Sequence, residues 1–205
     1  MTRGFSLIHF YRSFIHTAQT AGEGRAPLWC GTDIEGGRWM CRQNSGFPVV
    51  TDFRRWNMQP RVIDDEITLI PYYPCPEISL AWYQDPELCR QVDNIDHVYT
   101  LEMLNSMYAY LSTHGDCYYI EYRGRLVGDV SLRDNAEISI VICRELQNLH
   151  IGRRCVRDMI ALAGEKGMKE VKANIYSFNT QSRKMFERAG FRPVSEEWYV
   201  FDIKT

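Results

Sequence analysis

The sequence predicts an α/β domain with a mixed, mostly antiparallel central sheet flanked by helices and preceded by an N-terminal extension. Two observations support this class. Three strand-like segments follow one another across residues 117–143 with only tight turns between them, which is typical of an antiparallel meander. Over residues 153–203, amphipathic segments alternate with further strand-like segments, which indicates crossover connections. We therefore divide the chain into an extension, 1–65, and a domain, 66–205.

The extension differs in composition from the rest of the chain, because it contains many arginines, no lysine and a glycine-rich middle. Within it, Ile34–Trp39 predicts a β-hairpin, since its two adjacent glycines supply the positive φ angles of a tight turn. Phe47–Phe53 predicts a further strand. No motif in this segment indicates a catalytic or binding function. We expect it to pack on the domain or on a partner subunit, so that a homodimer formed through it is one expectation.

Composition limits the classes of function. The chain has 205 residues, of which 45% are hydrophobic, enough to bury a sizeable core. Its formal net charge of −2 gives no electrostatic footprint for nucleic acid or for an anionic membrane. No run approaches the roughly 18 apolar residues of a membrane-spanning helix. We therefore expect a soluble, cytoplasmic protein.

The seven cysteines are odd in number and include no C-x-x-C pair. In a chain of this size, that pattern argues against a disulfide framework and against a zinc site. We expect free thiols that behave as small buried hydrophobic residues, and no bound metal.

The first elements of the domain are short. Ile67–Ile70 predicts a strand ended by Pro71. Glu77–Tyr83 predicts a helix, which the pair Asp85-Pro86 stops because the residue before a proline disfavours the helical conformation.

A longer helix follows. Thr100 caps its start and Gly115 closes its end. Its apolar stripe consists of Leu101, Leu104, Tyr108 and Leu111. The three strands of the meander come next, with tight turns at Arg123-Gly124 and Asp134-Asn135. These strands are Cys117–Tyr122, Leu126–Leu132 and Glu137–Cys143.

The last part of the chain alternates helices and strands. Residues 153–166 predict an amphipathic helix, and Glu170–Tyr176 predicts a strand. Asn179–Ala189 predicts a second helix, capped by its first residue and terminated by Gly190. Phe191–Ile203 supplies the final strands. The apolar face of the first helix consists of Cys155, Val156, Met159, Ile160 and Ala163.

The junction between the strand ending near Cys143 and the helix beginning near Gly152 is the most informative stretch. A helix N-terminus exposes unpaired N–H groups and carries about half a positive charge, which suits a pyrophosphate. Gly152 allows close approach of the ligand to the backbone. Arg153 and Arg154 add full positive charges.

Two motifs around this junction resemble those of the GNAT superfamily of N-acetyltransferases. The pattern Gln147-x-x-His150-x-Gly152 resembles its acetyl-CoA signature. Downstream, a helix that begins with Asn179 and ends in Gly190-Phe191 resembles its second motif. The resemblance covers about residues 66–203. It implies a GNAT-type fold and acetyl-CoA-dependent transfer of an acetyl group to an amine.

The resemblance also implies roles for particular positions. The backbone groups of Ile140, Val141 and Ile142 pair with the pantetheine arm of acetyl-CoA like an added strand. Asn179 contacts the cofactor near the pantetheine, and a plain helix cap is the alternative role for it. The residues of the loop and of the first helical turn surround the pyrophosphate, namely Gln147, Asn148, Leu149, His150, Ile151, Gly152 and Arg153.

Three positions depart from the family pattern. His150 stands where the signature has its first glycine. Phe186 stands where many relatives carry a tyrosine that protonates the departing thiolate. Asn174 stands where the ribosomal-protein-acetylating relatives place a glutamate base. Catalysis in this chain must therefore rely on other groups.

We predict Glu137 as the general base, because it lies at the start of the strand beside the cofactor and a carboxylate with a raised pKa there would accept the ammonium proton directly or through water. The alternative for Glu137 is a strand-end charge in solvent. Tyr176 is the predicted acid, with Tyr199 behind it, and both have the alternative of core aromatic residues. A backbone N–H of Val141 or Ile142 is the predicted oxyanion donor.

The acceptor is predicted from a mixed acidic and aromatic segment, which would suit a small cationic amine through charge and cation–π contacts. A peptide or protein amine is the first alternative, and a non-catalytic acyl-CoA-binding module is the second. Packing of this segment on the core is the structural alternative. The segment contributes Trp82, Tyr83, Asp85, Glu87, Asp93, Asp96 and His97.

Overall fold

The structure, a computed structural model, describes residues 58–204. The hairpin predicted at 34–39, the strand predicted at 47–53 and the predicted dimer contact of the extension lie outside this range. The five cysteines within the range, Cys75, Cys89, Cys117, Cys143 and Cys155, are buried and form no disulfide with one another, as expected of them.

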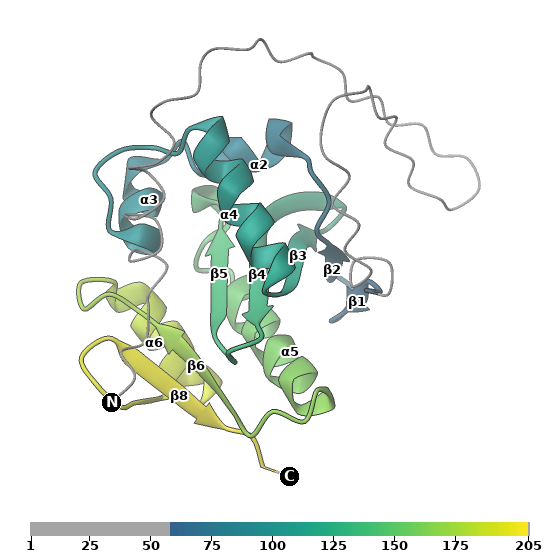
Figure 1. The fold of residues 1–205 in the computed structure, drawn as a ribbon, viewed down its shortest axis with the longest axis vertical. Coiled ribbons are helices and arrows are strands. Elements are labelled where there is room, and N and C mark those ends of the chain that lie inside the picture. Colours follow the sequence, from purple (N-terminus) through teal and green to yellow (C-terminus); the bar gives the residue numbers. More distant parts are fainter. Residues whose placement is uncertain (1–57, 205) are drawn as a thin grey trace. The chain divides into compact units, whose positions relative to one another are not determined.

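A five-stranded antiparallel sheet forms the first part of the core, with its strands in chain order (Figure 1). The strands are β1 (Arg61–Val62), β2 (Ile67–Pro71), β3 (Gly115–Tyr122), β4 (Arg125–Arg133) and β5 (Ile138–Ile142). At the β3–β4 turn, Arg123 and Gly124 both have positive φ, 52° and 78°, which confirms the predicted tight turn. Strand β1 falls inside the predicted extension, so the sheet begins before residue 66.

A smaller sheet has the order β6-β8-β7. Its strands are β6 (Glu170–Asn174), β7 (Arg192–Pro193) and β8 (Trp198–Asp202). A single parallel bridge between Glu137 and Lys172 links β5 to β6. Beyond this bridge the two strands belong to different sheets and separate (Figure 1). The predicted mixed, mostly antiparallel arrangement is therefore confirmed, and its sheet is split in two.

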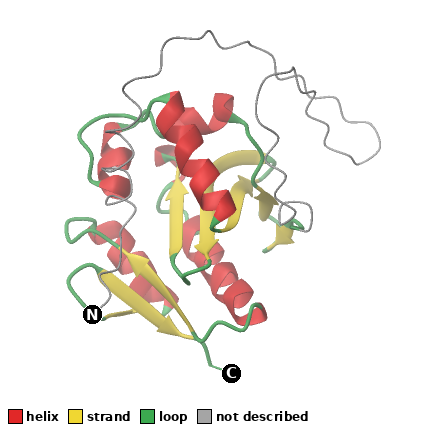
Figure 2. Cartoon of the chain, viewed as in Figure 1, coloured by secondary structure: helices red, strands yellow, loops and turns green. Residues whose placement is uncertain are grey.

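Helices cover both faces of the larger sheet (Figure 2). On one face lie α2 (Pro76–Trp82) and α4 (Leu101–Thr113), with α3 (Pro86–Asp93) between them in the chain. On the other face lies α5 (Ile151–Glu165), which packs against α6 (Thr180–Ala189).

The pair Asp85-Pro86 follows the end of α2, as predicted, and it also begins a helix, α3, that was not predicted. The carboxylate of Asp85 accepts hydrogen bonds from the backbone N–H groups of Glu87 and Leu88. Pro86 occupies the first helical position, where a missing N–H costs nothing. The same two residues therefore end one helix and start another.

Helix α4 begins as predicted, because Thr100 accepts a hydrogen bond from the N–H of Met103 (3.2 Å). Two details of the prediction were wrong. Leu101 is exposed, and Met107 is buried in the core instead. Gly115 is the first residue of β3, where a Cβ would lie 2.3 Å from the carbonyl oxygen of Leu132, so close strand approach explains this glycine.

Helices α5 and α6 agree with the prediction. The side chains that α5 buries include Cys155, Val156 and Met159. Asn179 caps α6 by accepting from the N–H of Ser182 (3.1 Å), and Gly190, with φ of 106°, closes it. The sequence in this region carries its own start and stop signals, so the helix bounds were predictable.

Candidate functional site

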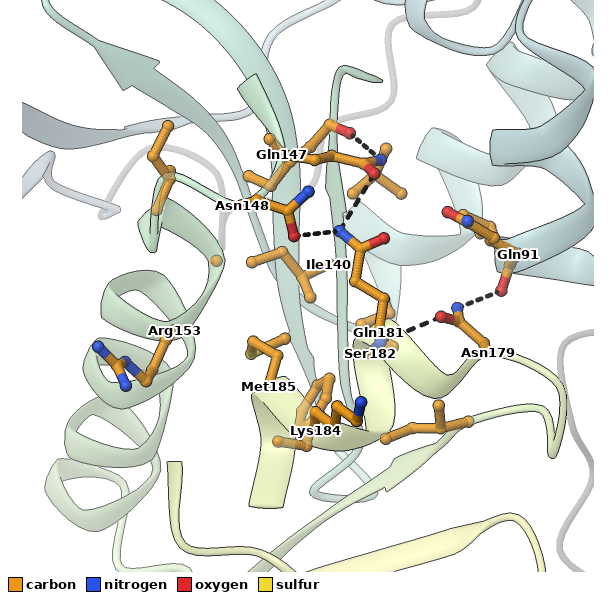
Figure 3. Close-up of a pocket in the computed structure, with 18 of the residues that line it drawn as sticks. Gln91, Ile140, Gln147, Asn148, Arg153, Asn179, Gln181, Ser182, Lys184 and Met185 are labelled. Carbon is orange, nitrogen blue, oxygen red and sulfur yellow. Dashed lines mark hydrogen bonds between the residues drawn. The ribbon is translucent and has the colours of Figure 1, made fainter. Parts of the chain in front are cut away.

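A cavity of about 460 Å³ lies where β5 and β6 separate. Its lining comes from β5, the loop that follows, the first turn of α5, one side of α6, the end of β6 and α3 (Figure 3). All the residues predicted to contact the cofactor line this cavity except Leu149, whose side chain is exposed.

The edge of β5 that faces the cavity is free of strand partners among the described residues. Cys143 N–H donates to Val127 O in β4, so alternation directs the backbone groups of Val141 toward β4 as well. Those of Ile140 and Ile142 face the cavity, and Ile142 O accepts from Gln147 Nε2 there (3.0 Å). The free edge can therefore accept an added strand at Ile140 and Ile142 but not at Val141.

The loop between β5 and α5 contains two residues in the left-handed conformation. Asn148 has φ of 64° and His150 has φ of 62°, directly before the first helical residue, Ile151. This explains the glycine of the family signature at position 150, because glycine adopts positive φ without steric cost. His150 adopts the same conformation at a cost of about 1 kcal/mol. Its ring is exposed and lines the cavity.

The glycine at position 152 has a different explanation, because backbone conformation does not require it. A Cβ there would meet no atom closer than 3.8 Å, at Ile140 Cδ1 and Met185 Cε. The fold itself therefore does not require glycine at this position. The open space over the first turn of α5 is a cradle that an added side chain would fill, beside N–H groups with no intrahelical partner.

Positive charge gathers on this lining. Arg153, Lys184 and Arg188 line the cavity together with His150, and no carboxylate is among the described residues that line it. Arg154 does not contribute. Its guanidinium instead donates from Nη1 to carboxylates of the β1–β2 region, namely Asp64 and Glu66, at 2.9 Å each.

Carboxamides connect α6 to the neighbouring elements (Figure 3). Gln181 Nε2 donates to Asn148 Oδ1 (3.1 Å) and to Gln147 Oε1 (3.3 Å) in the loop. Asn179 Nδ2 donates to Gln91 O in α3 (3.1 Å). The side chain of Asn179 is thus both a helix cap and a contact across the cavity.

Glu137, the predicted base, is buried next to the bridge where β5 and β6 part, and does not line the cavity. Its Oε1 forms an ion pair with the Arg133 guanidinium, and its Oε2 has no hydrogen-bond partner in the described part of the chain. Burial raises the pKa of Glu137, and the positive charges of Arg133 and Lys172 oppose that rise.

The other candidates for proton transfer are core residues. Tyr176, the predicted acid, is buried, stacks on Phe178 and does not line the cavity. Tyr199 is buried and accepts a hydrogen bond from Arg183 Nε (2.6 Å). Of the positions that depart from the family pattern, Phe186 and Asn174 both line the cavity.

The predicted acidic and aromatic wall is not part of the cavity lining. Trp82 and Tyr83 are buried in the core, and the Tyr83 hydroxyl donates to Asp129 (2.9 Å). Asp93 accepts from the hydroxyl of Tyr99, and Asp85 caps α3. The prediction of a wall was therefore wrong for these residues, because packing and hydrogen bonding within the domain already engage them.

Sequence reasoning missed the residues that α3 and α6 place in the lining. They are Leu88, Gln91 and Val92 from α3 and Gln181, Lys184 and Arg188 from α6. A signal for α3 was present, because an aspartate followed by a proline is typical of a helix start. The residues of α6 are polar positions on a correctly predicted helix, and only the tertiary structure shows which of them face the cavity.

Two further features are absent from residues 58–204. In this range no group of three or more His, Cys, Asp or Glu side chains is placed to bind a metal ion. None of its helices is both long enough and apolar enough to cross a membrane.

Comparison with known proteins agrees with this geometry. Residues 69–192 match the family model described as acetyltransferase (GNAT) domain. Among solved structures, a domain from Methanocaldococcus jannaschii is 25% identical with a TM-score of 0.60, and the match covers 68% of this chain and 99% of that one.

Two further structures share the fold at lower identity. One is an acetyltransferase from Salmonella typhimurium that modifies the N-terminal serine of a 50S ribosomal subunit protein. It is 12% identical, with a TM-score of 0.58 and coverage of 71% of this chain and 100% of that one. The other is spermidine N-acetyltransferase from Vibrio cholerae, solved with CoA and spermine. It is 11% identical, with a TM-score of 0.59 and coverage of 68% and 97%.

Proposed function

This chain belongs to the GNAT acetyltransferase family, an acyltransferase family that uses acetyl-CoA, and from that premise we propose that it transfers the acetyl group to a primary amine by direct attack. The cradle over Gly152 is the observation that carries the proposal. The fold does not need glycine there, whereas a pyrophosphate next to the helix N-terminus does.

The residues of the cavity fit acetyl-CoA in three ways. The free edge of β5 at Ile140 and Ile142 suits the amide groups of the pantetheine arm. The N-terminus of α5 suits the pyrophosphate, and Arg153 and Lys184 add positive charge. When bound, acetyl-CoA supplies the activated acetyl group as a thioester.

For polarisation of the thioester carbonyl we propose a backbone N–H on the free edge of β5. Ile142 is preferred over Val141, since alternation turns the N–H of Val141 toward β4. One such donor contributes about 3 kcal/mol of transition-state stabilisation. The amine nitrogen forms the new bond to the carbonyl carbon, the bond from that carbon to sulfur breaks, and the amine loses one proton.

For that proton we retain Glu137 as the proposed base. Its orphaned Oε2 supports the role, because a buried carboxylate oxygen without a protein donor is costly unless it has a function. Since Glu137 does not line the cavity, the proton reaches it through a relay such as water. Tyr176 stays the proposed source of a proton for the thiolate, with the same requirement.

The acceptor classes differ in how well they suit the lining. A small cationic amine such as a polyamine would need carboxylates, and the described lining contains none. The lining contributed by Leu88, Gln91 and Val92 from α3 and by Asn174 from β6 is apolar and amide-rich. Such a lining suits a peptide N-terminus, whose amine is flanked by backbone amide groups. We therefore propose a peptide amine, in preference to a small polycation, as the acceptor of the acetyl group.

Acetyl transfer to an amine panel tests the proposal. We would incubate the full chain with acetyl-CoA and short peptides with free N-termini, with spermidine and with an aminoglycoside, and measure free CoA. We expect CoA release with peptides above the rate of hydrolysis. Tight acetyl-CoA binding without CoA release on any amine would contradict the proposal and leave a non-catalytic acyl-CoA-binding module.

The variant Glu137→Gln tests the base in the same assay. Glutamine keeps an oxygen for Arg133 but cannot accept the proton. We expect turnover to fall by about 10² to 10⁴-fold, with acetyl-CoA affinity unchanged. Wild-type turnover in this variant would show that Glu137 only pairs with Arg133.

A further inference from the structure

Asn179 holds two helices at once. Its Oδ1 accepts from the N–H of Ser182 (3.1 Å), in the first turn of α6. Its Nδ2 donates to the carbonyl oxygen of Gln91 (3.1 Å), in the last turn of α3. The last four carbonyls of a helix have no intrahelical partner, so this bond satisfies an orphaned acceptor. One carboxamide therefore caps the start of one helix and the end of another.

The side-chain chemistry at this position is restrictive. The contact to Ser182 N–H requires an acceptor, and the contact to Gln91 O requires a donor, which fixes the orientation of the amide. Aspartate and serine cap helices about as well as asparagine. Aspartate has no donor, however, and the serine hydroxyl is too short to replace both contacts.

The two helices lie on different sides of the cavity. Helix α6 contributes Gln181, Ser182 and Met185 to its lining, together with the loop that holds the cofactor. Helix α3 contributes Leu88, Gln91 and Val92, on the side that the cofactor motifs leave open (Figure 3). The hydrogen bond from Asn179 therefore connects the cofactor side of the cavity to the wall that α3 contributes.

Among residues 58–204, two other polar side-chain contacts join α3 to the cofactor side. Arg144, in the loop after β5, forms an ion pair with Asp85 at the start of α3 (3.1 Å), largely in solvent. Arg90 lies over the ring of Phe178 (4.7 Å from the guanidinium carbon to the ring centroid). An exposed ion pair and an exposed cation–π contact are both weak. Leu88 and Cys89 pack α3 on the core, whereas the part-buried bond from Asn179 ties the end of α3 to the start of α6.

We propose that Asn179 is a positioning residue for the acceptor, because it fixes α3 at a set distance from α6 and so places the acceptor wall against the thioester. This inference rests on the proposed function for the identity of that wall. It assigns Asn179 an effect on the amine that is separate from the cofactor contact implied by the family resemblance.

Asn179→Ser tests the proposal, with Asn179→Asp as a second variant. Both retain the α6 cap and lose the donor to α3, and serine does so without adding charge. For the serine variant we expect the KM for the peptide amine to rise about tenfold, the value of one hydrogen bond, and by a larger factor than the Kd of CoA. A general loss of structure would instead lower kcat and weaken the binding of CoA and of the amine to a similar extent.

Hydrogen exchange gives a measurement that needs no amine. In both variants the amides of α3 should exchange about tenfold faster, while those of α6 keep their protection. Gln91→Ala is the matched control, since it removes the side chain and leaves the backbone oxygen that Asn179 contacts. Its α3 amides should exchange as in wild type.

Two results would overturn the proposal. One is a rise in the Kd of CoA with unchanged amine KM and unchanged exchange of α3, which would assign Asn179 to the cofactor alone. The other is fast α3 exchange in Gln91→Ala as well, which would assign the effect to side-chain packing. If no amine is acetylated, the proposed function fails, and the exchange of α3 still decides whether Asn179 holds this helix.

Discussion

The cofactor side and the acceptor side of the cavity are built by different means. The cofactor side uses backbone groups of β5, the loop and the first turn of α5, all within residues 138–153. The proposed acceptor side is formed by α3, which is joined to α6 by a side-chain bond between distant residues, Asn179 to Gln91. The core that adjoins it is held by similar bonds, such as Tyr83 to Asp129. A site built from the backbone of contiguous residues therefore leaves a motif in the sequence, whereas a site built from pairs of residues far apart in the sequence does not.

The largest expected effect concerns the core that adjoins the proposed acceptor side. Asp129 is fully buried and accepts from the hydroxyls of Tyr83 and Tyr108 at 2.9 Å each. These bonds anchor the α2 end and α4 to β4. Burial raises the pKa of Asp129 from 3.8 to about 6, and the two hydroxyls oppose that rise. The folded state therefore holds this proton more tightly than the unfolded state.

For Asp129→Asn we expect a change in the pH dependence of stability. In wild type, the contribution of Asp129 is full below pH 3.8 and is lost as pH rises to about 6, a difference of about 3 kcal/mol. The asparagine Oδ1 accepts the same two hydroxyls and does not titrate. Urea unfolding at about pH 4 and pH 7 measures this. From the lower to the higher pH, the free energy of unfolding of the variant should increase relative to that of wild type by about this amount. A difference in the free energy of unfolding that does not depend on pH would contradict this account of Asp129.

The second prediction concerns the cofactor side. In Gly152→Ala the new Cβ fits the empty fold, and alanine in a helix is favoured over glycine by up to about 1 kcal/mol. The melting temperature should stay equal or rise. The Cβ fills the cradle, however, so CoA affinity should fall about 10- to 100-fold, the cost of overpacking. Calorimetric titration with CoA measures this. Unchanged affinity would place the pyrophosphate elsewhere.

The smallest effect should come from relief of strain in the loop. His150→Gly removes a side chain from a left-handed residue, so the free energy of unfolding should rise by about 1 kcal/mol. Asn148→Gly is the matched control at φ of 64°. Its gain should be smaller, because asparagine tolerates this conformation better than most residues. Thermal unfolding compares the two. A loss of stability in His150→Gly would show that the imidazole holds the loop by a contact.

Most of the fold was predictable from sequence because its signals are local. Thr100 and Asn179 mark helix starts, Gly190 marks a helix end, and Arg123-Gly124 marks a tight turn. The exceptions are also instructive. Asp85-Pro86 fits both a helix end and a helix start, and it serves as both, because α2 ends before it and α3, which buries Leu88 and Cys89, begins at Pro86.

The acceptor side could not be predicted, because the same residue types serve packing and recognition. Tyr83 and Asp93 have the chemistry to bind a cationic amine, yet each is engaged by a partner that the sequence does not identify. Conversely, the contact of Asn179 with Gln91 joins residues 88 positions apart and concerns a backbone oxygen. No pattern of side chains indicates such a contact.

The most direct test of the central claim is a crystal structure of the full chain with CoA. The account predicts the pantetheine along the free edge of β5 at Ile140 and Ile142, with the pyrophosphate over Gly152. The sulfur should then lie between β5 and β6, facing α3. CoA bound away from this cavity, or a pyrophosphate away from the first turn of α5, would contradict it.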